Sequence, residues 1–181
     1  MRGISDTNIL DTFCLEFCNI IEKHSPYIVV SGFVAISSGR VRATEDIDMI
    51  VPRLSAEQFK QLHKDLERDF VCVQSDDADT IYDYLINNTA VRYTWKNEPL
   101  PEMEIKFVKD KLDEYQIQTK VKLDLTGLDI WFSSVEMNIA FKELLLKSEK
   151  DLKDAEHLRK VYTVDEKEVQ HIKKLIREYR L

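Results

Sequence analysis

Hydrophobic and polar positions in the first part of the chain alternate with two different periods. In residues 6–23 the apolar side chains recur at helical spacing, and Ser25-Pro26 ends that helix. Residues 27–30 are β-branched or aromatic and favour a strand, whereas Phe33–Ser38 allows a short helix. Residues 45–51 alternate and predict a second strand. The expected order is therefore helix, strand, short helix, strand.

The pattern then continues as a mixture of helices and strands. Ser55 followed by Gln58 is a capping box and opens the next helix. The further expected elements are a strand at 70–73, a helix at 78–86, strands at 89–95 and 103–108, a helix or loop at 109–120, and strands at 121–125 and 128–132.

From residue 133 onward the apolar positions follow helical spacing only. Three helices are expected in this part, and they start at Ser133 with Glu136, at Ser148, and at Thr163 with Glu166. The pattern predicts an α+β fold with a sheet domain over residues 1–132. A C-terminal helical segment, residues 133–181, is expected to pack on it as a small bundle.

Composition narrows the class of protein. The 181 residues are 44% hydrophobic and 33% charged, enough for a domain with a substantial core. The net charge of −7 argues against a broadly basic nucleic-acid clamp. Residues 141–181 hold 11 lysines and arginines against 9 acids, so a local RNA-facing surface stays open. With three cysteines, no signal peptide and no long apolar run, we expect a cytoplasmic protein without a membrane partner.

The strand at residues 45–51 carries the first candidate chemistry. Asp46 and Asp48 are two residues apart, and a strand turns such residues to the same face. Two neighbouring carboxylates repel each other unless a cation or a proton intervenes. Mg²⁺ prefers such oxygens and completes its shell with water and phosphates. The alternative is a solvent-facing strand that happens to be acidic.

The stretch from Tyr27 to Pro52 resembles the signature of the polymerase-beta-like nucleotidyltransferase superfamily. Ser31-Gly32-Phe33 is followed by twelve residues and then Asp46-Ile47-Asp48-Met49, which matches the family spacing. The wording of residues 42–48 resembles the branch that includes the abortive-infection toxin nucleotidyltransferases. The resemblance implies a mixed sheet flanked by helices. Phe33 departs from the family pattern, which usually has a second Gly or a Ser there.

Several residues around this stretch are candidate nucleotide ligands. A glycine turn before a helix lets backbone N–H groups approach a phosphate, and a hydroxyl could replace the missing family residue. Guanidinium groups match phosphate geometry, although they could equally form a solvated loop. Thr44 could bind the nucleotide or shape the turn. The candidates are Ser31, Gly32, Ser37, Ser38, Arg40, Arg42 and Thr44.

The family places a third acid on a later strand, and Glu104 is the preferred candidate. It lies in a strand where Met103, Ile105 and Phe107 share one face and Glu104 and Lys106 share the other. A strand flanked by another strand suits the central sheet. Asp124 and Asp129 remain alternatives, and Glu104 could instead be a surface glutamate paired with a neighbour.

The C-terminal part resembles the same branch. Ser134-Val135-Glu136 precedes Lys142, and Lys150-Asp151-Leu152-Lys153-Asp154 follows, although the family proline is absent. The resemblance implies that Lys142 contacts the nucleotide and that Lys150, Asp151 and Asp154 help to build the site. Each residue also has an ordinary explanation as a cap or a surface charge.

The resemblance implies a metal-dependent nucleotidyltransferase that uses Mg²⁺, or Mn²⁺ in its place. Asp46, Asp48 and Glu104 would hold the metal, and a nucleoside triphosphate would donate its nucleotide to RNA, protein or a small molecule. The alternative is a catalytically silent module of the same fold that binds nucleotide or a partner. A toxin of a two-gene system is a further hypothesis, and an aminoglycoside- or lincosamide-type modifier is less favoured. The oligomeric state is left open.

Overall fold

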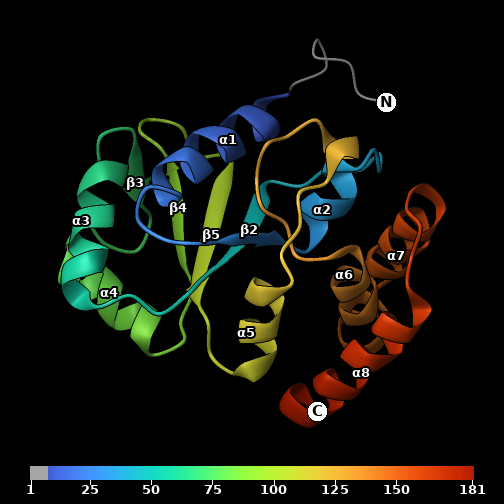
Figure 1. The fold of residues 1–181 in the computed structure, drawn as a ribbon. Coiled ribbons are helices and arrows are strands. Elements are labelled where there is room, and N and C mark those ends of the chain that lie inside the picture. Colours follow the sequence, from blue (N-terminus) through green and yellow to red (C-terminus); the bar gives the residue numbers. More distant parts are fainter. Residues whose placement is uncertain (1–7) are drawn as a thin grey trace.

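The computed structural model describes residues 8–181 and contains a five-stranded mixed sheet (Figure 1). The strand order is β1-β2-β5-β4-β3, in which β2 and β5 run parallel and the other neighbours antiparallel. The strands are β1 (Ile28–Val30), β2 (Asp46–Val51), β3 (Phe70–Cys72), β4 (Val91–Trp95) and β5 (Glu102–Phe107). Both the α+β class and the mixed sheet are therefore confirmed.

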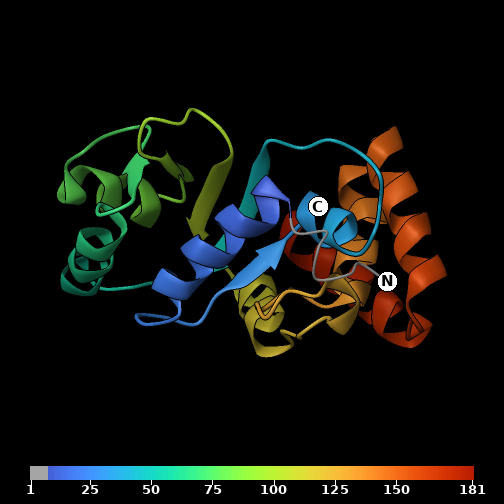
Figure 2. The ribbon, with the colours of Figure 1, turned by 90° about the horizontal axis from the view of Figure 1, so that it is seen from above.

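Helices flank the sheet on both sides. Figures 1 and 2 show α3 and α4 on one side of the molecule and α6, α7 and α8 on the other. The helices are α1 (Ile9–Ile21), α2 (Gly32–Ser37), α3 (Ala56–Leu66), α4 (Ala78–Ile86), α5 (Lys111–Gln118), α6 (Val135–Phe141), α7 (Glu149–Val161) and α8 (Glu166–Arg180), with a 3₁₀ turn at Asp124–Thr126 and a π-helical turn at Lys142–Leu146.

The two central strands present opposite characters on their two faces. Ile47, Met49 and Val51 of β2, with the alternate positions of β5, are buried in the main core. Aromatic side chains of α1 and α3 pack there, including Phe17 against Tyr93 and Phe59 against Phe107. The other face carries Asp46, Asp48 and Ile50, because side chains alternate along a strand. The polar face is therefore the one left for function.

The prediction of two strands within residues 121–132 is wrong. This segment makes only single-residue bridges, Val121 with Phe132 and Val29 with Phe132, and contains a 3₁₀ turn that Gly127 closes at φ +69°. Its apolar side chains still point inward, since Leu123, Leu128 and Ile130 are buried. The alternation reflected burial against the core, not pairing with a neighbouring strand.

The expected helix starts are partly correct. Ser55 and Ser148 cap α3 and α7, each in a capping box. Ser134 caps α6 in place of the expected Ser133, whose side chain is buried against Asn138. Asp165, and not Thr163, caps α8. The expected start of α1 at residue 6 lies outside the described residues.

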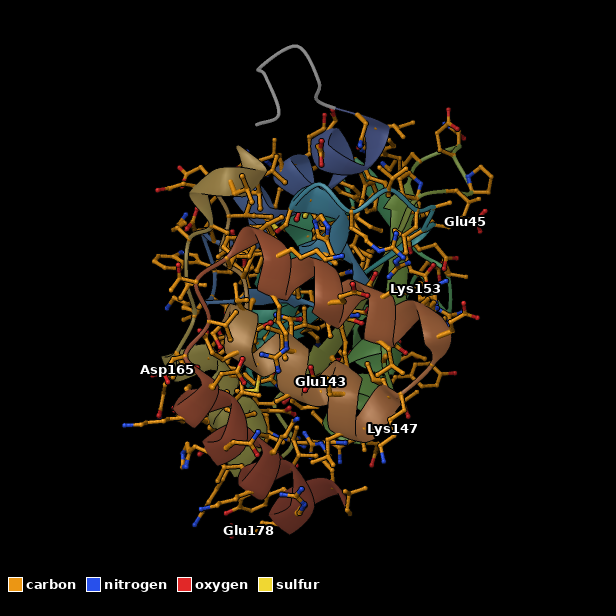
Figure 3. All side chains as sticks on the ribbon, turned by 90° about the vertical axis from the view of Figure 1, so that its right-hand side faces the viewer. Glu45, Glu143, Lys147, Lys153, Asp165 and Glu178 are labelled. Carbon is orange, nitrogen blue, oxygen red and sulfur yellow. The ribbon has the colours of Figure 1, made fainter. Side chains whose placement is uncertain are left out.

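The C-terminal helices pack on the sheet and on one another. Met137 of α6 and Ile172 of α8 belong to the same buried cluster as Met49 of β2. On the outer side, Glu143 lies at the centre of the helical face (Figure 3) and accepts hydrogen bonds from Arg159 at 3.0 Å and Lys173 at 2.7 Å. The helices thus form a bundle that shares the sheet's core. None of the helices in residues 8–181 is long and apolar enough to cross a membrane.

Candidate active site

Three acids lie on the polar face of the sheet, in the neighbouring strands β2 and β5. In the parallel pairing of β2 with β5, Asp48 is the direct partner of Glu104, and Asp46 is the partner of Glu102. Asp46 and Asp48 share a face because they are two residues apart in β2. Of the other candidates for the third acid, Asp124 lies in the 3₁₀ turn and the Asp129 side chain is 94% exposed beside Lys122. Register therefore favours Glu104.

Arg92 is a functional candidate that the sequence did not reveal. It lies in β4 directly opposite Glu104, and its Nε is 3.4 Å from the Glu104 carboxylate and 3.7 Å from that of Glu102. The register of the β4–β5 hairpin places Arg92 opposite Glu104. The loop of this hairpin contains a cis Leu100–Pro101 peptide bond. From the sequence alone, Arg92 could have been found only by pairing the residues of the two strands outward from the loop of this hairpin. Arg92 offsets part of the negative charge of the site.

Asp48 lies in an environment that opposes its ionisation. Burial raises its pKa to about 6, and the charges of Glu104 and Asp46 act in the same direction. The charge of Lys106 and a hydrogen bond from the Ser31 side chain lower the pKa and offset part of the rise. A site with surplus negative charge stabilises a bound cation.

The donor set of this site fits a hard divalent ion in type. Asp46, Asp48 and Glu104 supply only carboxylate oxygens, which Mg²⁺ and Mn²⁺ accept. Within the part of the chain that the structure describes, no three acid, His or Cys side chains converge into a ready metal-binding group. Glu104 faces Arg92, whose Nε is 3.4 Å from one Glu104 oxygen. A metal ion at all three acids would compete with Arg92 for the Glu104 carboxylate.

The side chains of Asn138 and Arg42 contact the glycine turn before α2. Ser31 has φ +68° and ψ −135°, and its backbone N–H donates to the Asn138 side chain at 3.1 Å. A Cβ at Gly32 would overlap the Arg42 guanidinium, so the loop before β2 folds directly onto the turn. A larger residue at this position would have to displace the end of the flexible Arg42 side chain.

A buried network of charges holds that loop in place. Asp154 is fully buried and accepts two hydrogen bonds from Arg42, at 3.0 and 2.8 Å. It also lies 3.4 Å from Arg40 and 3.0 Å from Lys142, whose ammonium is 3.3 Å from Asp151. Burial alone would raise the pKa of Asp154, but Arg42 and Lys142 hold it below its ordinary value. Asp154 joins α7, the loop and the π-helical turn.

A cavity of about 320 Å³ opens beside Asp48. Its lining includes the cations Lys106, Lys109, Lys142 and Arg180 together with Asp113, and it also includes apolar side chains. The π-helical turn at Lys142–Leu146 contributes both charged and apolar residues to this lining; such turns are frequent at functional sites. The lining residues are Val30, Ser31, Asp48, Ile50, Lys106, Lys109, Asp113, Gln116, Met137, Asn138, Phe141, Lys142, Leu145, Leu146 and Arg180.

The remaining sequence candidates lie elsewhere. The Ser37 and Ser38 hydroxyls are buried and donate to the carbonyls of Phe33 and Val34 within α2. Thr44 donates to the Asp46 carbonyl at 3.2 Å and shapes the turn, which was one of its two expected roles. Lys150 is exposed on α7. None of these four lines the cavity beside Asp48.

Comparison with solved structures identifies the fold. The solution structure of the antibiotic-resistance factor ANT(2'')-Ia superposes with a TM-score of 0.54 at 13% identity, over 93% of this chain and 91% of that one. The chain has the polymerase-beta-like nucleotidyltransferase fold. The expected resemblance is thus confirmed at the level of fold, and the abortive-infection branch stays a prediction.

Other comparisons add little to the nucleotidyltransferase fold. JHP933 from Helicobacter pylori matches with a TM-score of 0.47 at 14% identity, over 87% of this chain and 69% of that one, and this value is too low to support an inference. No known protein-family profile matches the chain, and no curated protein does so either.

Proposed function

We propose that this chain is a metal-dependent nucleotidyltransferase. One observation carries the proposal: on a nucleotidyltransferase fold, Asp48 is the register partner of Glu104, shares a face with Asp46 and opens onto a cavity. The reaction would transfer a nucleoside monophosphate from a nucleoside triphosphate to a hydroxyl acceptor. RNA, a protein and a small molecule are the three acceptor classes.

The acids would divide the chemistry between them. Asp46, Asp48 and Glu104 would hold Mg²⁺ or Mn²⁺, which when bound offsets the charge on the transferred phosphate. Asp48 has to be ionised for this, and its raised pKa of about 6 in the metal-free protein means that protons compete with the metal as the pH falls. The acceptor oxygen bonds to the α-phosphorus, the bond to pyrophosphate breaks, and Glu104, once free of Arg92, takes the hydroxyl proton. Most of the acceleration would come from positioning and charge.

Label transfer from α-labelled nucleoside triphosphates tests the proposal. Wild type is incubated with Mg²⁺ or Mn²⁺ and total RNA, a cell extract, the protein itself, or hydroxyl-bearing antibiotics. The last acceptor is included because the matching structure belongs to an antibiotic-resistance factor. We expect label in one fraction from wild type and none from Asp48→Asn. Equal transfer by Asp48→Asn would overturn the assignment.

A catalytically silent nucleotide-binding module is the second candidate. It is favoured by Arg92, which holds Glu104 in an ion pair, and by Arg42, which covers the glycine turn. This candidate predicts metal-dependent nucleotide binding without transfer to any acceptor. Expression toxicity that disappears in Asp46→Ala would instead support a toxin of a two-gene system.

A further inference from the structure

Two cations in the cavity beside Asp48 lack an acidic partner. Among the residues that the structure describes, no carboxylate forms an ion pair with Lys106 or Lys109. Asp113, whose charge acts on Lys109, already accepts from Arg180 at 2.7 Å and from the Gln116 side chain at 3.1 Å. Desolvation and the charge of Arg180 lower the pKa of Lys109, as expected for a cation beside another cation. An anion in this cavity would relieve both lysines.

Lys142 and Arg180, the other cations of the cavity, are already neutralised. Lys142 is 1% exposed and paired with Asp151 and Asp154, and Arg180 is paired with Asp110 and Asp113. Their charges are therefore committed to holding the helices together. The two unpaired lysines are the groups that remain for a ligand.

The position of the two lysines suits a substrate that also reaches the acids. Lys106 lies two residues beyond Glu104 on the same face of β5, about 7 Å along the strand. Its charge already acts on Asp48, which borders the same cavity. A chain of phosphates could thus extend from the acids at Asp48 toward Lys106 and Lys109.

The glycine turn is partly covered by other side chains in this structure. The Arg42 guanidinium lies on Gly32, and the Ser31 N–H is already bonded to Asn138. Helix α2, with six residues, is also too short to supply a strong dipole. The role that the family resemblance gives to this turn is therefore open to another part of the chain.

We infer that Lys106 and Lys109 bind the phosphate chain of the nucleoside triphosphate, in place of the glycine turn. The inference rests on the proposed function and specifies where its donor substrate lies. The apolar lining residues Phe141, Leu145 and Leu146 then receive the base, and Leu146 is 47% exposed. Charge-assisted hydrogen bonds from two ammonium groups anchor the phosphates without a contribution from α2.

Equilibrium binding of labelled ATP, GTP, CTP and UTP in EDTA tests the inference, because it needs neither metal nor acceptor. Each charged contact contributes enough that Lys106→Gln or Lys109→Gln should weaken binding roughly 10-fold or more. Lys111→Gln is the matched control, because Lys111 is exposed at the start of α5 and outside the cavity. It should bind within about twofold of wild type. Inorganic tripolyphosphate should displace the nucleotide from wild type.

The outcomes separate this inference from the proposed function. If wild type transfers no label but binds nucleotide in a manner dependent on both lysines, the proposed function fails and the inference stands. If Lys106→Gln and Lys109→Gln bind as tightly as Lys111→Gln, the inference is overturned even where transfer is observed. Lys106→Arg and Lys109→Arg keep the charge and should recover part of the affinity. Far-UV circular dichroism establishes that each variant is folded.

Discussion

Ionisation of Asp48 lowers the stability of the folded protein, and the size of this effect depends on pH. The rise of its pKa from 3.8 to about 6 corresponds to about 3 kcal/mol, because ionisation is opposed in the folded state. The folded protein binds this proton more tightly than the unfolded chain. The resulting stability is therefore fully present below about pH 4 and is lost as the pH rises through 6.

The variant Asp48→Asn should remove that cost. At pH 8 we expect its free energy of unfolding to exceed that of wild type by up to about 3 kcal/mol, and near pH 4 the two should be equal. Urea unfolding at pH 4, 6 and 8 in EDTA measures this. Asp129→Asn makes the same change on an exposed surface and serves as the control. A stability difference independent of pH would contradict the assignment of the raised pKa.

The backbone of Ser31 has φ +68°, a conformation that residues other than glycine rarely adopt. Such strain costs about 1–3 kcal/mol, so Ser31→Gly should be more stable than Ser31→Ala. Both variants lose the hydrogen bond that lowers the pKa of Asp48, and both should therefore shift the activity midpoint to higher pH. Thermal unfolding and pH–rate profiles test the pair. The prediction fails if the alanine variant is the more stable.

Single residues of the site were predictable only where local alternation was sufficient. The common face of Asp46 and Asp48 follows from strand periodicity, and so does that of Glu104 and Lys106, whereas Glu104 was selected because the family resemblance implies a third acid on a later strand. Arg92 and Arg42 could not be placed in this way. Their partners, Glu104 and Asp154, lie on other elements, and strand register and loop path decide those contacts.

At the scale of elements, the cap of α7 links helix stability to the cavity. Ser148 and Asp151 form its capping box, and the Asp151 carboxylate also pairs with Lys142 in the cavity wall. Ser55 and Gln58 form an equivalent box on α3, away from the cavity. The two caps therefore make a matched pair for mutation.

Ser148→Ala and Ser55→Ala should each lose about 1 kcal/mol of stability, because each removes one N-cap. Only Ser148→Ala should also change nucleotide affinity, because losing the Ser148 hydroxyl displaces Asp151, which helps to hold Lys142 in the cavity wall. Chemical denaturation and equilibrium binding measure the two effects. Equal nucleotide affinity in both variants would separate the α7 cap from the site.

Helices and strands were predictable where a single periodicity of apolar residues ran between residues that end a helix or strand. The strands β2 and β5 and the helices α3 and α4 meet this condition. Residues 121–132 do not, because their alternating apolar positions are buried without a strand partner along their length. The caps of α6 and α8 were misplaced by one or two residues because neighbouring Ser, Thr and Asp side chains compete for the same role.

At the scale of the whole molecule, one buried cluster runs from Phe13 of α1 to Ile176 of α8. A continuous core predicts that the sheet domain and the C-terminal helices unfold together. Trp95 packs on Phe13, and Trp131 lies in the segment before α6, so each tryptophan reports a different region. Single Trp→Phe variants should show coincident transitions by fluorescence and far-UV circular dichroism. Separate midpoints would instead divide the chain near residue 132.

The parallel pairing of β2 with β5 also has a consequence for folding kinetics. Asp48 and Glu104 are partners although 56 positions separate them, and the intervening chain forms α3, β3, α4 and β4. Closing so long a loop is entropically unfavourable until the contacts that compensate for it have formed. The acids should therefore meet late, after the antiparallel strands β3, β4 and β5 have assembled. A refolding chain would regain most of its helical signal before it regains affinity for a metal ion.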